Sequence, residues 1–327
     1  MKYPQFLRTN DTIGISAPSS GVGEKIDSFN ASLDTLHRQG YYTKETASVR
    51  NPDARSANAF VRGQELTSLF SDTDVNMVMC AAGGDFLIET LEHIDFETLA
   101  SHPKWYMGAS DPTSILYCYT TKYDVATIYG LNAGSYDLGE DFDYVHTNLE
   151  YLKGNLIPQH TYPMCLPKAK FMVEEIAYDT PDEWYSNKQT FHVRGRCIGG
   201  CIDVLKDLIG TPYEDTLGFI ERYKEDGTIF YFDNFSMSAE MFYRTLLQFK
   251  YAGWFRYTKA VLLGRVLFES SETGMDYAEA MHLALQDMPY IYCADIGHTI
   301  PAMTLINGAM VDVDFADNAG TLTFTLQ

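Results

Sequence analysis

The sequence carries little positive charge for its length. Its 327 residues include 24 Lys and Arg against 44 Asp and Glu, which gives a formal net charge of −20. A surface of this sign repels a phosphate backbone and an anionic membrane, so neither nucleic acid nor membrane is an expected partner. The ordinary effect of such acidity is to keep a protein soluble and monodisperse.

Long apolar runs and paired cysteines are missing too. No stretch approaches the ~18 apolar residues of a membrane span, and the N-terminus has no apolar core typical of a signal peptide. The six cysteines are scattered, mostly in apolar runs, as reduced core residues are. Cys197 and Cys201 lie four positions apart, with no second pair nearby at zinc-site spacing. We therefore expect a cytoplasmic protein with no metal.

What the sequence does contain is an alternation of strands and helices. Apolar runs at residues 12–17, 75–81 and 105–107 predict strands, and helical patterns follow at 26–39, 86–91 and 112–121. This alternation predicts an α/β fold with a parallel sheet. Ligands of such sheets collect at the carboxyl ends of the strands. The loops that follow the three strands, residues 17–21, 82–85 and 108–111, are therefore expected to share one cleft.

The second half is organised differently. Residues 179–189 are polar and interrupted by Pro181, which predicts a linker or an excursion between domains. Further strand and helix patterns begin at residue 191, among them an amphipathic helix at residues 239–250 with Ser238 as its expected cap. We therefore predict an N-terminal α/β domain over residues 1–150, an excursion over 151–190 and a C-terminal domain over 191–327.

Ser110 stands at a predicted turn from strand to helix. Gly108 permits a tight turn, and Pro112 suits the first turn of a helix. Ser110 would then lie at a helix N-terminus, where N–H groups favour developing negative charge, as in a nucleophile elbow. Pro112 replaces the second glycine of G-x-S-x-G, however, and a serine at this place is also an ordinary helix cap.

Two other segments fit the same chemistry. Gly83-Gly84 follows the strand at 75–81, and an exposed amide there, with the N–H of Asp111, could form an oxyanion hole. An ordinary turn is the alternative. His298 stands in a loop between a glycine and a later proline, where it could act as a general base.

In this order, the segments resemble the LD-carboxypeptidase family of serine peptidases, which includes murein tetrapeptide carboxypeptidases and the microcin C immunity peptidase. The resemblance covers nearly the whole chain. It rests on these segments: Asn10-Asp11-Thr12-Ile13 with Ala17-Pro18-Ser19-Ser20, Ala82-Gly83-Gly84-Asp85, Met107-Gly108-Ala109-Ser110-Asp111-Pro112-Thr113, Gly195-Arg196-Cys197-Ile198-Gly199-Gly200-Cys201, and Gly297-His298-Thr299-Ile300-Pro301.

The resemblance implies a Ser-His-acid triad in which Ser110 is the nucleophile and His298 the general base. The family's glutamate ends an apolar strand, and here Asp233 holds that position, which makes it the expected acid. Glu240 is a nearby alternative on the following helix. The resemblance also implies a glutamine-amidotransferase-like first domain, a swivelling β/α second domain, a homodimer and no cofactor.

The substrate has two readings. Asp182-Glu183-Trp184-Tyr185 resembles the tryptophan-bearing excursion of the microcin C immunity branch, which implies that Trp184 stacks on a nucleobase and that an aminoacyl-nucleotide amide is cut. Surface packing is the alternative for Trp184. Ala82 stands where several tetrapeptide enzymes have the arginine that binds a terminal carboxylate, so cleavage of a murein tetrapeptide is the second reading. A binding protein with a weakened site, rather than an enzyme, is a further alternative.

Overall fold

The protein consists of two compact units. The computed structural model describes residues 1–327, and its first unit comprises Met1–Leu156 with Thr304–Gly308. The second comprises Ile157–Met303 with Ala309–Gln327. Compared with the predicted boundaries, the first unit extends to Leu156, the rest of the excursion belongs to the second unit, and Thr304–Gly308 returns to the first. The mixed α/β fold is as predicted, and no helix has the length and apolar character needed to cross a bilayer.

The first unit is built on a six-stranded sheet with the order β14-β5-β4-β3-β1-β2. Its strands are β1 (Thr12–Ser16), β2 (Tyr42–Glu45), β3 (Met77–Cys80), β4 (Trp105–Gly108), β5 (Thr127–Tyr129) and β14 (Leu305–Asn307). All neighbours are parallel except β14, which is antiparallel to β5. Because the strand order reverses between β1 and β3, a crevice is expected at their carboxyl ends.

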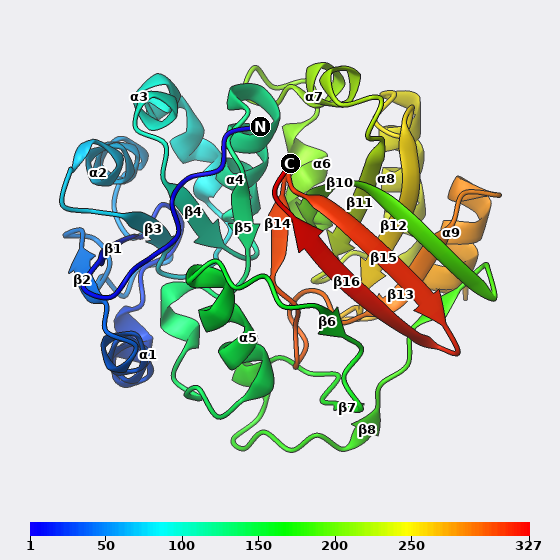
Figure 1. Ribbon diagram of the computed structural model, residues 1–327, viewed down its shortest axis with the longest axis horizontal. Coiled ribbons are helices and arrows are strands. Elements are labelled where there is room, and N and C mark those ends of the chain that lie inside the picture. The colour runs from blue at the N-terminus through cyan, green and yellow to red at the C-terminus, as the bar shows by residue number, and fades with distance from the viewer. The chain divides into compact units, whose positions relative to one another are not determined.

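Helices cover both faces of this sheet. They are α1 (Ile26–Arg38), α2 (Ala59–Ser71), α3 (Phe96–Ser101), α4 (Thr113–Tyr123) and α5 (Asp143–Leu152). α1 lies on one face, and α2, α3 and α4 lie on the other (Figure 1). The helix predicted from residue 86 is instead a 3-10 helix at Leu87–His93. The buried apolar strands between these layers form the core.

The second unit contains an eight-stranded sheet with the order β6-β16-β15-β10-β11-β12-β13-β9. Its strands are β6 (Gln159–His160), β9 (Tyr185–Ser186), β10 (Thr190–Cys201), β11 (Thr228–Asp233), β12 (Thr258–Gly264), β13 (Tyr290–Ala294), β15 (Met310–Ala316) and β16 (Ala319–Thr325). The four strands β10 to β13 are parallel, and the others pair antiparallel. The long β15–β16 hairpin is drawn in red in Figure 1.

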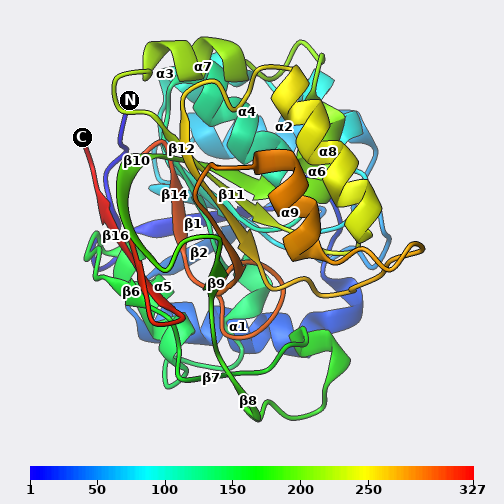
Figure 2. The ribbon, with the colours of Figure 1, turned by 90° about the vertical axis from the view of Figure 1, so that its right-hand side faces the viewer.

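Four helices belong to this unit: α6 (Ile202–Leu208), α7 (Thr216–Arg222), α8 (Ala239–Tyr251) and α9 (Tyr277–Leu285). The predicted cap of α8 is present, since the Ser238 side chain accepts a hydrogen bond from the Met241 N–H. Helices α8 and α9 pack side by side (Figure 2). The excursion adds β6 and β9 to opposite edges of the large sheet and forms a separate pair, β7 (Met164–Cys165) with β8 (Thr180–Pro181).

Candidate active site

Ser110 occupies a strained turn between β4 and α4. Its φ of 70° lies in the left-handed region, which costs a non-glycine residue roughly 1–3 kcal/mol. The turn is held because the Ser110 N–H donates to the Tyr129 hydroxyl at 3.1 Å and the Ser110 carbonyl accepts from the Thr113 N–H at 2.9 Å. A serine in a strained turn just before the N-terminus of a helix has the geometry of a nucleophile elbow.

The Gly83-Gly84 turn lies directly beside this serine. A Cβ placed on Gly83 would come within 3.0 Å of the Ser110 Cβ and 3.2 Å of its Oγ. Gly84 has a φ of 147°, and a Cβ there would lie 2.3 Å from the Ser19 Oγ. Both φ and close approach therefore favour glycine at position 84, whereas a Cβ at position 83 would require Ser110 to shift by a few tenths of an ångström. The backbone N–H groups of Gly84 and Asp111 donate to no group of the chain, which leaves them available to an oxyanion.

The Asp111 side chain ties the loops around Ser110 together. Its carboxylate accepts from the Ser19 hydroxyl, and from the Leu87 N–H at 2.9 Å. Burial raises the pKa of Asp111 to about 6, although both hydrogen bonds act to lower it. The ends of β1, β3 and β4 are thus joined through one buried acid, consistent with the shared cleft that the sequence predicted.

His298 and Asp233 are in contact within the second unit. The His298 Nδ1 lies 2.8 Å from Oδ2 and 3.0 Å from Oδ1 of Asp233, and the carboxylate is completely buried at the end of β11. If Nδ1 carries the proton donated to Asp233, Nε2 is left as the base. Burial lowers the pKa of His298, but the charge and hydrogen bond of Asp233 outweigh it, so the pKa is raised overall.

Two neighbours shape the His298–Asp233 pair. Gly297 has a φ of 106°, and a Cβ there would fall 2.0 Å from the Asp233 Oδ1, so only glycine lets the loop come this close. The Phe235 ring lies 4.8 Å from the imidazole, centroid to centroid. The turn that carries Phe235 is fixed because its N–H and that of Ser236 donate to Asp203, at 2.9 and 3.1 Å.

Glu240, the alternative acid, is engaged elsewhere. Its Oε1 accepts from the Ser271 and Thr273 hydroxyls and from the N–H groups of Glu272 and Thr273. These hydrogen bonds lower the pKa of Glu240 well below its usual range. Of the two candidates, only Asp233 contacts the histidine.

Trp184 is completely buried in the second unit. Its indole Nε1 donates to the Asp295 Oδ2 at 2.9 Å, and a Cβ at Gly320 would lie 2.2 Å from its ring. This position favours a packing role, because a buried ring has no free face on which a base can stack. The predicted contact with a nucleobase stays a prediction, one that would require the ring to move.

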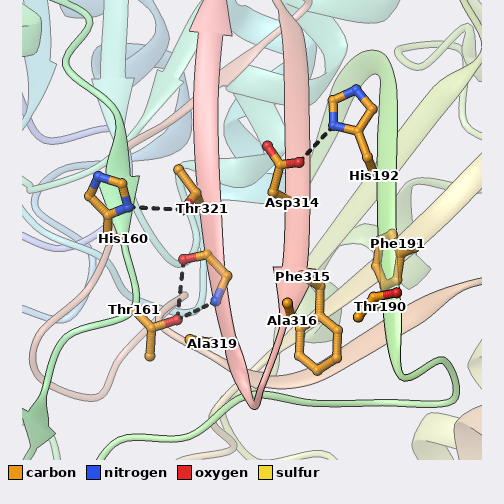
Figure 3. A pocket seen from close by; sticks show the side chains of 11 residues that line it. His160, Thr161, Thr190, Phe191, His192, Asp314, Phe315, Ala316, Ala319 and Thr321 are labelled. Atoms are coloured by element: carbon orange, nitrogen blue, oxygen red, sulfur yellow. Dashed lines mark hydrogen bonds and ion pairs between the residues drawn. The ribbon is translucent and has the colours of Figure 1, made fainter.

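A separate open pocket of about 550 Å³ lies on the sheet of the second unit (Figure 3). His192, Asp314, Thr321 and His160 form one row across β10, β15, β16 and β6. The His192 Nδ1 lies 2.8 Å from the Asp314 Oδ1, and the His160 Nδ1 lies 2.9 Å from the Thr321 hydroxyl. The pocket includes none of the predicted site residues, and no group of three or more His, Cys, Asp and Glu side chains is arranged to hold a metal ion.

Sequence reasoning missed several residues that contact Ser110, Asp111 or His298. Ser19, Tyr129 and Phe235 contact the predicted residues from loops or strand ends that are distant in sequence. Ser19 had a visible signal, since it follows the first strand of a parallel sheet. Nothing in the local sequence indicates Tyr129 or Phe235, because their roles come from tertiary contacts alone.

Comparison with known proteins finds two family domains along the chain. The LD-carboxypeptidase N-terminal domain matches residues 13–130, and the LD-carboxypeptidase C-terminal domain matches residues 194–313. The microcin C7 self-immunity protein of Escherichia coli is 25% identical over 97% of this chain and 94% of its own length. A Bacillus subtilis protein named a probable murein peptide carboxypeptidase is 27% identical over 68% of this chain and 66% of its own.

A solved structure extends the likeness to the fold. The microcin C7 self-immunity protein in complex with aspartyl sulfamoyl adenosine superposes with a TM-score of 0.82, at 21% identity and over 99% of both chains. At this level of identity, the superposition concerns the fold alone.

Proposed function

Because the chain belongs to the LD-carboxypeptidase family and is a hydrolase of the serine peptidase type, we propose that it cleaves an amide bond with Ser110, His298 and Asp233 as its triad. The contact between His298 and the buried Asp233 carries this proposal. The strained Ser110 turn beside two available amides supports it from the other unit.

The proposed chemistry is acyl transfer in two steps. His298 Nε2 takes the proton of the Ser110 hydroxyl, and Oγ attacks the amide carbonyl. The N–H groups of Gly84 and Asp111 hold the oxyanion, each worth roughly 3 kcal/mol of barrier. His298 then protonates the leaving amine, and water releases the acyl group from Ser110. Asp233 orients the imidazole and stabilises its charged form.

For the substrate, we propose an aminoacyl-nucleotide amide. One of the relatives that span nearly the whole chain is the microcin C7 self-immunity protein, which has been solved with aspartyl sulfamoyl adenosine. A carboxypeptidase needs a cation for the terminal carboxylate, and two arginines near Ser19, Arg55 on a loop and Arg62 on α2, already have partners. Arg62 is buried against Glu89 and the Pro18 carbonyl, and Arg55 pairs with Glu89 and stacks on Phe86 at 3.6 Å.

A murein tetrapeptide is the second candidate. The named Bacillus subtilis relative favours it, as does the family itself. The homodimer and the cytoplasmic location that the sequence suggested stay predictions.

Hydrolysis of both substrates by one preparation tests the proposal. We expect release of the amino acid from aspartyl sulfamoyl adenosine, with little or no D-alanine released from an L,D-tetrapeptide. Ser110→Ala should lower kcat by at least about 10⁴-fold while the fold stays intact. Preferred cleavage of the tetrapeptide would favour the second candidate substrate, a murein tetrapeptide. Wild-type rates in Ser110→Ala would exclude the mechanism for either substrate.

A further inference from the structure

A buried guanidinium lies beneath the loop that carries His298 (the His298 loop, residues 295–303). Arg265 directly follows β12, and its side chain is only 8% exposed. Its Nη1 donates to both oxygens of Asp182, at 2.9 and 2.8 Å, and to Asp295. Two carboxyl groups thus share one cation away from water, an arrangement that is costly unless it is completely hydrogen-bonded.

The remaining nitrogens of Arg265 donate hydrogen bonds to the loop on the C-terminal side of His298. Its Nε donates to the Thr299 hydroxyl at 2.9 Å, and its Nη2 donates to the Pro301 carbonyl. The loop is closed behind the histidine because the Met303 N–H donates to the Asp295 carbonyl at 2.7 Å. The guanidinium thereby fixes the backbone that aims the imidazole, without touching either member of the His298–Asp233 pair.

The excursion holds the same loop from the outside. Asp182 belongs to the excursion, as does Trp184, whose indole donates to Asp295. Leu166 and Ile300 exchange both backbone hydrogen bonds, at 2.7 and 3.2 Å. The segment expected to be a linker is thus attached to the His298 loop by one backbone bridge and by the buried cluster.

We propose that Arg265 and Asp182 are positioning residues for His298, and that the excursion keeps the general base in its working orientation through them. The inference rests on the proposed function for its effect on rate, whereas its effect on the geometry of His298 can be measured without any substrate. A loop released at Thr299 and Pro301 would let the imidazole leave Asp233, and misplacement of a catalytic group by about 1 Å can cost roughly 100-fold in rate.

The ionisation of the cluster supplies a conservative variant. Burial, with the hydrogen bond and charge of Asp295, raises the pKa of Asp182. A protonated Asp182 is mimicked by asparagine, which keeps one acceptor for Arg265 and one donor for Asp295. Asp182→Ala, by contrast, leaves Arg265 and Asp295 short of a partner. Asp179 belongs to the same excursion and is exposed, so Asp179→Asn is the matched control.

The test combines imidazole ¹⁵N NMR of His298, assigned with His298→Gln, and steady-state kinetics. In Asp182→Ala we expect the titration midpoint of His298 to fall, because the Asp233 contact loosens, and kcat to drop roughly 10- to 100-fold with KM within about twofold. Asp182→Asn and Asp179→Asn should match wild type in both readouts. An unchanged His298 midpoint and kcat in folded Asp182→Ala would overturn the proposal.

Thr299→Val provides an independent variant in case Asp182→Ala does not fold. It removes one Arg265 bond while keeping the side-chain shape, and should lower the His298 midpoint in the same direction. An unchanged midpoint in this variant would also count against the proposal. If wild type hydrolyses neither substrate, the proposed function fails, but the NMR comparison still decides the positioning role.

Discussion

Ser110 has a backbone conformation that only glycine adopts without cost. Its φ of 70° is held by the bonds to Tyr129 and Thr113 rather than by any preference of serine. We therefore predict that the Ser110→Gly variant has a free energy of unfolding about 1 kcal/mol higher than the Ser110→Ala variant, since glycine relieves the strain. Urea unfolding of both variants measures the difference. Equal stability would mean that the turn stores no strain.

The His298–Asp233 contact sets the pH at which the base becomes active. Since the pKa of His298 is raised above its ordinary 6.5, activity should increase with pH through a midpoint above 6.5 as the imidazole loses its proton. Asp233→Asn should move this midpoint downward, because the anion that favours the imidazolium is gone, and lower kcat by roughly 10⁴-fold.

The pH dependence of kcat/KM measures both effects. Glu240→Gln is the matched control: it removes a carboxylate that supports only the turn at residues 271–273, so its profile should follow wild type. A large loss in Glu240→Gln, with near-normal Asp233→Asn, would reverse the assignment of the acid.

At the scale of elements, Asp111 connects the loops that follow β1, β3 and β4, and its contribution to the free energy of unfolding depends on pH. Its pKa is about 6 in the folded protein against 3.8 as the ordinary value, so the folded chain holds this proton more tightly than the unfolded chain. The stabilising contribution of Asp111 is therefore fully present below about pH 4 and is lost as the pH rises through about 6. Asp111→Asn should gain about 2–3 kcal/mol relative to wild type between pH 4 and pH 7.

Denaturant unfolding of wild type and Asp111→Asn at a series of pH values measures this gain. Asp53→Asn, on an exposed carboxylate of the same unit that does not contribute to the Asp111 shift, controls for the loss of one charge. A difference between wild type and Asp111→Asn that stays constant with pH would show that Asp111 does not titrate in this range.

The elements differ in how well the sequence predicts them. Buried apolar strands such as β1 and β4, and the capped amphipathic helix α8, were predicted within a few residues, because their patterns extend over several positions. The sequence predicts no strands in the excursion, since β6, β7, β8 and β9 have two residues each and show no periodicity. The three-residue β14 was missed for the same reason, and its pairing with β5 is remote in sequence.

At the scale of the whole molecule, the chain places its predicted nucleophile in one unit and its predicted base and acid in the other. The order of motifs along the sequence, through the family resemblance, predicts Ser110, His298 and Asp233 as the triad. It did not indicate the residues that hold them, such as Asp203, Tyr129 and Arg265, because hydrogen bonds between distant segments leave no local pattern.

Reaction with a fluorophosphonate tests most directly whether Ser110 and the His298–Asp233 pair act as one catalyst. We predict covalent labelling of wild type at Ser110, located by peptide mass spectrometry, and labelling at least about 100-fold slower in folded His298→Ala. Absence of labelling in folded wild type, or equal labelling of the His298→Ala variant, would contradict the triad. The first of these results would instead indicate a binding protein built on a peptidase fold.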